Sequence, residues 1–340
     1  MKVILKTKID EDLEKIWKNL EEKNKLMIFQ TLKWNRAWIK INNLTKNIKI
    51  FIINVNNEAV GIFPFYEKKI FKSKIIRWIG FDTSDYLGPI IDANFKPTQV
   101  EFNNLWKNIL DQLKNETDLI LLDKLINKSF TFLNPLTEYL YCQKYDTTYG
   151  INLNEWENIL LRKNRSLQKI RWSKRKLENL GKIEFVESLD DLKEKKKIID
   201  QLILWKKESK KNYRFLKSFS GSFYLNFINS DDVQISGLKL NNNYIALSFG
   251  LKFDDNYFYL VPSYKSEKNI IRYSPGKILM IELINFFHKK NFEYFDFCNG
   301  NEKYKQEWSD TKIDVKVYIK SLSVKGFFLK LFYKLRYIKI

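Results

Sequence analysis

The sequence predicts an α+β protein in which each of two halves holds a largely antiparallel mixed sheet flanked by helices. The chain has 340 residues, more than one domain usually holds, and 44% of them are hydrophobic, which is enough for two cores. β-Branched runs bounded by turn residues alternate with segments of helical periodicity. These elements follow one another in a similar order in both halves, which favours two related domains.

Periodicity in the first half predicts three helices and four strands. The helices are expected at 10–24, 29–38 and 102–113, and the strands at 48–55, 59–66, 75–79 and 119–122. Asn56 and Asn57, between the first two strands, tolerate positive φ and predict a hairpin turn. Residues 81–89 are expected to form a loop.

The second half begins with a long basic helix, expected at 153–181 and ended by Gly181. Further helices are expected at 193–209, 219–229 and 275–290, and strands at 233–240, 244–253, 257–264 and 294–297. Asn- and Asp-rich turns at 241–243 and 254–256 join the first three of these strands and predict hairpins. The second half therefore predicts a three-stranded meander, a helix and one further strand.

Composition narrows the classes of function. A formal net charge of +20 attracts anions such as phosphorylated cofactors, nucleic acid or acidic lipid headgroups, without choosing among them. Cys142 and Cys298 are far apart and predict neither a disulfide framework nor a zinc site, so no metal is expected and a cytoplasmic location fits. The single histidine, His288, lies in an apolar helical run, so triad catalysis is not favoured.

A strand at Tyr257–Tyr264, a polar loop and Ser274-Pro275-Gly276-Lys277 at the start of a helix form the strongest local pattern. Proline is preorganised for the first helical position, Ser274 can cap the helix, and Gly276 lets another group approach the backbone. A helix N-terminus also offers free N–H groups and a positive dipole end to an anion. The pattern therefore indicates an ordinary helix start or a phosphate site.

A second pattern follows that helix. A strand carrying Asp296 leads to a turn at Gly300, after which Tyr304, Lys305 and Trp308 share one short helical turn. The two rings fit a core. Lys305 fits either a solvated surface or a site, and the residues alone do not decide between them.

Other motifs carry a wider resemblance, which covers most of residues 28–310. They are Phe29-Gln30 with Trp34 and Trp38, Gly61-Ile62-Phe63-Pro64, Ser84-Asp85-Tyr86-Leu87-Gly88, the basic helix around Arg162–Arg175, and Trp205-Lys206. With the two patterns above, they make the chain similar to the CelD/BcsL-type, BioF2-like acetyltransferases of the GNAT superfamily. That family is related to the FemABX peptidoglycan aminoacyltransferases.

The resemblance implies two tandem GNAT-like domains, at 1–150 and 151–320, followed by a basic amphipathic tail at 321–340. It implies that the strand with Val261 and Pro262 lines the pantetheine arm of acetyl-coenzyme A or another acyl-coenzyme A. Ser274, Pro275, Gly276 and Lys277 would then hold its pyrophosphate. The segment departs from the usual Gln/Arg-x-x-Gly-x-Gly/Ala loop, because it has one glycine and a proline.

Amide formation requires the acceptor amine to lose a proton and the tetrahedral oxyanion to be stabilised. Asp296 and Glu307 are the candidate bases, beside Tyr304, and Lys305 is expected to neutralise the developing charge, as its resemblance to the FemABX lysine implies. The residues expected to contact the acceptor are Asp85, Tyr86, Arg165 and Trp205.

The function expected is N-acyl transfer, of acetyl in the first instance, from coenzyme A to an amine of a cell-envelope sugar or polysaccharide precursor. One alternative is a FemABX-like transferase that takes aminoacyl-tRNA, favoured by the basic helix and the irregular loop. Another is a non-catalytic basic module that binds nucleic acid or a membrane surface. That module would need base-stacking aromatics beside basic residues, and no such run is apparent.

The C-terminal tail predicts an amphipathic helix. In projection, one side gathers Phe327, Phe328, Leu331, Phe332, Leu335 and Ile338, with basic residues away from its centre. Such a helix fits docking on the first domain, or peripheral contact with the anionic inner face of a membrane.

Overall fold

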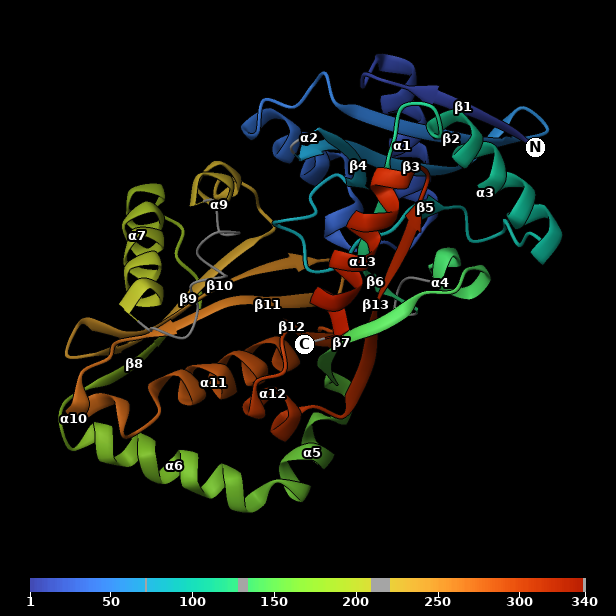
Figure 1. Cartoon of the computed structure of the whole chain (residues 1–340). Coiled ribbons are helices and arrows are strands. Elements are labelled where there is room, and N and C mark those ends of the chain that lie inside the picture. Colours follow the sequence, from blue (N-terminus) through green and yellow to red (C-terminus); the bar gives the residue numbers. More distant parts are fainter. Residues whose placement is uncertain (71, 128–133, 209–220, 339–340) are drawn as a thin grey trace. The chain divides into compact units, whose positions relative to one another are not determined.

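The computed structural model describes residues 1–70, 72–127, 134–208 and 221–338 (Figure 1). The chain forms two compact units. The first holds Met1–Thr147 together with Ile313–Ile340, and the second holds Thr148–Lys312. The end of the chain therefore belongs to the same unit as its beginning.

The sheet of the first unit has the strand order β1-β2-β3-β4-β6-β13, and the short β5 pairs with β3. Its strands are β1 (Lys2–Lys6), β2 (Ile48–Val55), β3 (Glu58–Ile70), β4 (Ser73–Trp78), β5 (Ile90–Ile91), β6 (Leu119–Ile126) and β13 (Thr311–Ser321). All neighbours are antiparallel except β4 and β6, whose parallel ladder joins only Ile75 to Leu119 and Ile76 to Ile120.

Helices supply the other layers of the first unit. They are α1 (Glu11–Lys23), α2 (Leu32–Ile41), α3 (Gln99–Leu113), α4 (Pro135–Tyr139) and α13 (Val324–Ile338), with the 3-10 turn η1 (Ile28–Gln30). A Thr98 and Glu101 capping box starts α3, whose apolar side then packs on Phe63, Phe65 and Leu122. Burial of these aromatic and branched side chains holds the unit together.

The sheet of the second unit has the order β8-β9-β10-β11-β12-β7. Its strands are β7 (Gln143–Asn152), which crosses the boundary between the units, β8 (Ile183–Val186), β9 (Val233–Leu240), β10 (Asn243–Phe253), β11 (Asn256–Tyr264) and β12 (Tyr294–Asn299). Asn241, Asn242 and Asp254 have positive φ in the turns around β10, which confirms both predicted hairpins.

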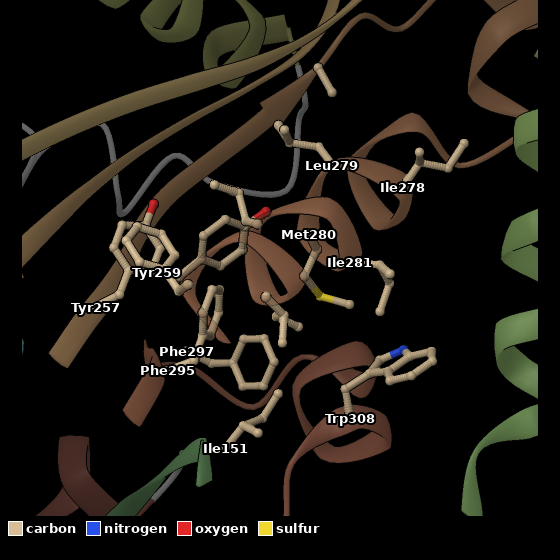
Figure 2. Packing of buried hydrophobic residues seen from close by; sticks show 14 of the residues in the cluster. Ile151, Tyr257, Tyr259, Ile278, Leu279, Met280, Ile281, Phe295, Phe297 and Trp308 are labelled. Carbon is tan, nitrogen blue, oxygen red and sulfur yellow. The ribbon is translucent and has the colours of Figure 1, made fainter. Parts of the chain in front are cut away.

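The helices of the second unit flank this sheet. They are α5 (Trp156–Arg162), α6 (Asn164–Glu178), α7 (Leu192–Glu208), α9 (Gly221–Phe227), α10 (Lys268–Ile271), α11 (Pro275–Lys289) and α12 (Lys303–Trp308), with the 3-10 turn η2 (Leu153–Glu155). The apolar residues of α11 meet Tyr257, Tyr259, Phe295 and Phe297 of the sheet in one core (Figure 2). Helix α11 thereby joins β11 to the parallel strand β12.

The two units repeat one topology, which confirms the predicted tandem fold. In each, three antiparallel strands are followed by a helix and by a strand parallel to the third: β2, β3, β4, α3, β6 and β9, β10, β11, α11, β12. In each, the last of these strands takes an antiparallel neighbour on its other side, β13 or β7. Short hairpins join the antiparallel strands, whereas the parallel strand is reached through a longer crossover that contains the helix.

Several predicted elements need correction. The helix expected at 153–181 is η2, α5 and α6, interrupted at Lys163, which lies outside helical geometry with ψ at 20°. The apolar stripe continues across this break, so its periodicity did not reveal it. Strands β1, β5, β7, β8 and β13 were not predicted. Of the helices expected at 193–209 and 219–229, Ser209 and residues 219–220 lie outside the described residues.

Helix α13 docks on the first unit by the side opposite to its large apolar face. Tyr333 and Tyr337 enter a cluster with Leu119, Leu121 and Val317. Gly326 lies against the carbonyl of Asp118, where an added Cβ would come within 1.7 Å of the oxygen. The docking is therefore made by tyrosine rings and one close backbone approach.

Candidate active site

The turn between β12 and α12 is organised by Asp296. Its Oδ1 accepts a hydrogen bond from the backbone N–H of Cys298 at 2.6 Å, inside the core. Cys298 has a φ of 61°, a left-handed conformation that is costly for a residue with a side chain. Strained backbone of this kind persists only where its surroundings hold it, and here the carboxylate of Asp296 does so.

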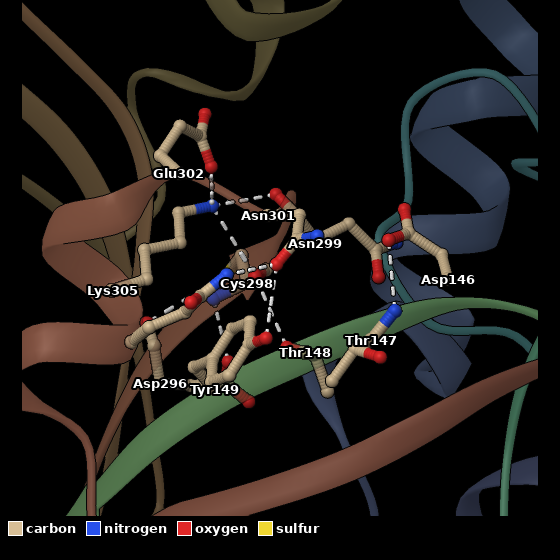
Figure 3. Close-up of polar contacts among 11 residues, drawn as sticks. Asp146, Thr147, Thr148, Tyr149, Asp296, Cys298, Asn299, Asn301, Glu302 and Lys305 are labelled. Atoms are coloured by element: carbon tan, nitrogen blue, oxygen red, sulfur yellow. Dashed lines mark hydrogen bonds and ion pairs between the residues drawn. The ribbon is translucent and has the colours of Figure 1, made fainter. Parts of the chain in front are cut away.

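Lys305 holds the same turn from α12 (Figure 3). The residue is only 4% exposed, and its ammonium donates to the carbonyl oxygens of Asn299 at 2.6 Å and Cys298 at 3.4 Å. It also forms an ion pair of 3.0 Å with Glu302, whose side chain is 54% exposed. An ammonium has three N–H donors, so this geometry uses all of them. The long bond to Cys298 and the exposed Glu302 are the partners it can exchange for a substrate oxygen.

Strand β7 supports the turn from the other side, as Figure 3 shows. The Thr148 hydroxyl donates to the carbonyl of Cys298 at 3.0 Å, and the Tyr149 hydroxyl donates to Oδ1 of Asn301 at 2.9 Å. These residues come from a strand that the sequence did not predict. Their alternation of small polar and aromatic side chains was the available signal.

Strands β11 and β12 separate beside this turn. Their parallel ladder joins Asn256 to Tyr294, Tyr257 to Phe295 and Phe258 to Asp296, although β11 continues to Tyr264. Val261 and Pro262 lie on the part of β11 beyond the ladder, where β10 still pairs with its other edge. Backbone groups on an unpaired strand edge are available to an extended ligand.

Helix α11 begins near the end of β11. Ser274 has a φ of 51° and makes no side-chain cap, contrary to the prediction, because a left-handed residue carries its hydroxyl away from the first N–H groups. Pro275 is buried at the first helical position, as predicted. A Cβ on Gly276 would lie 2.9 Å from the Tyr264 ring, so only glycine fits without displacing that ring.

Glu307 and Lys277 form an ion pair of 3.0 Å between α12 and α11. Burial favours the neutral acid, but hydrogen bonds from Ser166 and Lys277 outweigh it and lower the pKa of Glu307. A carboxylate with a lowered pKa is a weaker base. The geometry therefore favours a positioning role for Glu307 over proton abstraction.

The aromatic residues of α12 pack in the hydrophobic core of the second unit. Trp308 is fully buried against Trp156, and the Tyr304 ring meets Phe297 edge-on. Burial raises the pKa of Tyr304, so its hydroxyl stays protonated near neutral pH and can donate a hydrogen bond. Trp205 is likewise buried, in α7.

Lys206, which follows Trp205, is the residue that sequence reasoning missed. Burial lowers its pKa to about 8, with Glu302 acting in the opposite direction and Lys305 adding to the decrease. The charges of Glu302 and Lys305, in the same unit, thus act on Lys206 in opposite directions. The Trp205-Lys206 motif was the available signal, but only Trp205 was taken from it.

Of the remaining predicted residues, Asp85 and Tyr86 belong to the first unit, and Arg165 belongs to the second. Tyr86 is fully buried in the first unit, where its ring meets Phe29 edge-on, and Asp85 beside it is half-buried. Burial favours a packing role for the Tyr86 ring. Arg165 lies exposed on α6 in the second unit.

His288 lies between a backbone carbonyl and a carboxylate. Its Nδ1 lies 3.0 Å from the carbonyl oxygen of Leu153, and its Nε2 lies 3.5 Å from Glu157. Over the described part of the chain, no three His, Cys, Asp or Glu side chains are grouped to hold a metal ion.

Comparison with known proteins finds a domain that contains most of these elements. The model of the acetyltransferase (GNAT) domain matches residues 162–306, which include β11, α11, β12 and most of α12. No curated protein matches the sequence of the chain.

Solved structures similar to the chain extend over both of its units. FemX has 13% identity and a TM-score of 0.59, covering 92% of this chain and 97% of its own. L-PGS from Bacillus licheniformis has 12% identity and a TM-score of 0.53, covering 91% and 96%. A tandem GNAT protein from the clavulanic acid biosynthesis pathway has 6% identity and a TM-score of 0.51, covering 95% and 98%. At these identities the likeness concerns the fold. The chain is therefore an acyltransferase built on a GNAT domain at residues 162–306, with the fold of tandem GNAT proteins.

Proposed function

We propose that the chain transfers an acyl group, acetyl in the first instance, from coenzyme A to an amine of a cell-envelope sugar or polysaccharide precursor. The observation that carries this proposal is the three-residue ladder between β11 and β12. Among the residues that the structure describes, no strand pairs with this edge of β11 beyond the ladder, beside the N-terminus of α11. An extended amide-bearing arm can pair with that edge while its phosphates meet the helix N-terminus.

The residues around the start of α11 fit a polyanionic donor. Lys268 and Arg272 precede the helix, and Lys277 lies in its first turn. The irregular loop therefore supplies positive charge although it lacks the second glycine of the usual pattern. Val261 and Pro262 remain the proposed contacts for the pantetheine arm.

In the proposed reaction, the acceptor amine loses a proton and attacks the thioester carbonyl. The N–C bond forms, the C–S bond breaks, and coenzyme A leaves as the thiolate, which takes up the proton removed from the amine. Lys305 stabilises the oxyanion by exchanging one of its present partners. Lys206 takes the amine proton, because a lysine with a pKa of about 8 is partly neutral near physiological pH.

A thermal-shift titration with coenzyme A and acetyl-coenzyme A tests donor binding. Saturation at about 100 times Kd stabilises the protein by about 2.7 kcal/mol and raises Tm. Lys277→Met is expected to weaken binding by about 10- to 100-fold, since a charged hydrogen bond contributes roughly 1.5–3 kcal/mol. Lys289→Met, at the exposed end of the same helix, is the matched control. An absence of any shift with thioesters would contradict the coenzyme A donor.

Lys206→Met tests the base. The wild-type kcat/KM is expected to rise with pH up to about 8 and then level off. In the variant, kcat/KM should fall by about 10²–10⁴-fold and should no longer rise with pH in this range. Because the pKa of Lys206 is below its unfolded value, its charged form is costly at neutral pH. The variant should therefore be more stable at pH 7, by about 2 kcal/mol. Lys197→Met, exposed on the same helix, should change neither property. An unaltered pH profile in Lys206→Met would reject the assignment.

A second candidate donor, aminoacyl-tRNA, is favoured by the outer face of α6. Its exposed basic residues are Arg165, Lys169, Arg171, Arg175 and Lys176. Trp172 lies half-exposed among them, against Lys176 and the Tyr273 ring. Binding of tRNA that falls steeply with salt, without any thioester shift, would favour this donor.

A cell-envelope acceptor also fits a position at the inner face of a membrane, which forms part of the proposal. None of the described helices has the length and apolar character needed to span a bilayer. Any attachment through these helices would therefore be peripheral.

A further inference from the structure

Helix α13 carries two apolar faces, and the described residues of the chain cover only one of them. The inner face, with Leu329, Tyr333 and Tyr337, packs on the sheet of the first unit. The outer face bears six large side chains that are each 45% to 77% exposed: Val324, Phe327, Phe328, Leu331, Phe332 and Leu335. At about 100° per residue these six form one continuous stripe opposite the tyrosines. A stripe of this kind is unusual on a surface in contact with water alone.

Charge borders this stripe on both sides. In the same projection, Lys325 and Arg336 lie along one margin, and Lys330 and Lys334 lie along the other. The helix contains no acidic residue. An apolar stripe between two basic margins has the composition of a helix that lies in the headgroup region of an anionic bilayer.

The helix is held in place before any partner arrives. The Tyr337 hydroxyl donates to Oδ2 of Asp123 at 2.7 Å, inside the first unit, and the Tyr145 ring meets the Tyr337 ring edge-on. At the other end, the backbone N–H of Gly326 donates to the Ser323 hydroxyl at 3.1 Å. Because the helix is already folded and docked, binding through its outer face does not require the entropy cost of ordering a disordered segment.

We propose that the outer face of α13 is a membrane-binding surface that recognises anionic phospholipid. Phe327, Phe328, Leu331, Phe332 and Leu335 enter the acyl-chain boundary, and the four basic residues meet the headgroup phosphates. The helix lies along the surface and does not cross it, since its 15 residues are fewer than the roughly 20 of a membrane span. The inference does not depend on the identity of the acyl donor or acceptor.

Vesicle flotation of the full chain tests this surface without any substrate. The wild type is expected to float with phosphatidylcholine–phosphatidylglycerol vesicles and much less with phosphatidylcholine alone, and added salt should reduce the effect. Phe328→Ser/Phe332→Ser/Leu335→Ser should lower partitioning by about 10-fold or more, with Tm unchanged because these side chains are exposed.

A matched triple variant separates this surface from general surface hydrophobicity. Val100→Ser/Tyr141→Ser/Leu161→Ser removes three large side chains elsewhere that are even more exposed, and it should keep vesicle binding. Lys330→Glu/Lys334→Glu should lose binding to anionic vesicles, which gives an independent test of the basic margin. The proposal is overturned if the wild type fails to bind anionic vesicles or if the α13 triple variant binds as well as the wild type. It is also overturned if the outer face instead mediates a dimer in sedimentation equilibrium.

Discussion

Lys305→Met is expected to lower kcat by about 10²–10³-fold, the loss associated with one well-placed oxyanion donor. The ammonium of Lys305 is the buried cation at the end of β12, held by two backbone carbonyls and Glu302. Its removal takes away the charge that we propose to stabilise the oxyanion. Steady-state kinetics with the acceptor in excess measures the effect.

Two comparisons distinguish this role from a structural one. The thermal shift with the acyl donor should persist in Lys305→Met, because α11 and the edge of β11 are unchanged. Lys303→Met, exposed on the same helix, should keep full activity. Normal turnover by a folded Lys305→Met protein would show that the lysine only braces the turn.

The second large effect concerns stability. Arg77→Met should destabilise the first unit by about 3–5 kcal/mol, because it leaves the carboxylate of Asp123 buried without its cation. Arg77 donates to both oxygens of Asp123 at 2.8 Å, and both residues are buried. For a unit of this size the loss corresponds to roughly 10 °C in Tm, which calorimetry measures.

A double variant distinguishes two causes of this destabilisation, the unpaired charge of Asp123 and the loss of packing around Arg77. Arg77→Met/Asp123→Leu should regain most of the stability, since an apolar pair of similar volume often replaces a buried ion pair at little cost. Tyr337→Phe removes only one hydrogen bond to the carboxylate and should cost about 1.5–3 kcal/mol. Equal stability of the single and double variants would contradict this account.

The same pair has a pH dependence of defined sign. Burial favours the neutral form of Asp123, but Arg77 and Lys124 outweigh burial and lower its pKa. A lowered carboxyl pKa contributes stability above the unfolded value, and this contribution disappears as pH falls through the folded value. The contribution should be absent from Arg77→Met. The free energy of unfolding of this variant should therefore decrease less as the pH falls through the acid range.

Local patterns in the sequence were sufficient to predict the elements whose conformation depends on residues close to them in the chain. The hairpin turns at Asn241–Asn242 and Asp254, helix α11 with its buried Pro275, and the short α12 all follow from residues within a few positions. Strands β7 and β13 were missed because neither is apolar along its length. Their pairing with β12 and β6 joins residues more than 100 positions apart in the chain.

Some features of the candidate site were likewise visible in the sequence, and others appear only in the folded structure. The motif around Asp296 and Lys305 was visible in the sequence, and the structure brings both residues to one turn. The pairing of Glu307 with Lys277 joins two helices that meet only in the folded unit, and the lowered pKa of Lys206 results mainly from its burial there. No spacing along the chain could indicate these contacts.

By itself, the sequence determined the α+β elements of both halves and the amphipathic nature of the tail, because periodicity encodes them, and it indicated the acyl-transfer class through its resemblance to a known family. Only the tertiary structure decided which face of α13 is covered. The most apolar side was the natural choice for docking, yet Tyr333, Tyr337 and Gly326 make the contact. The reason is physical: the sheet offers a buried carboxylate at Asp123 and a close backbone at Asp118. A tyrosine hydroxyl and a glycine satisfy these groups, whereas phenylalanine and leucine cannot.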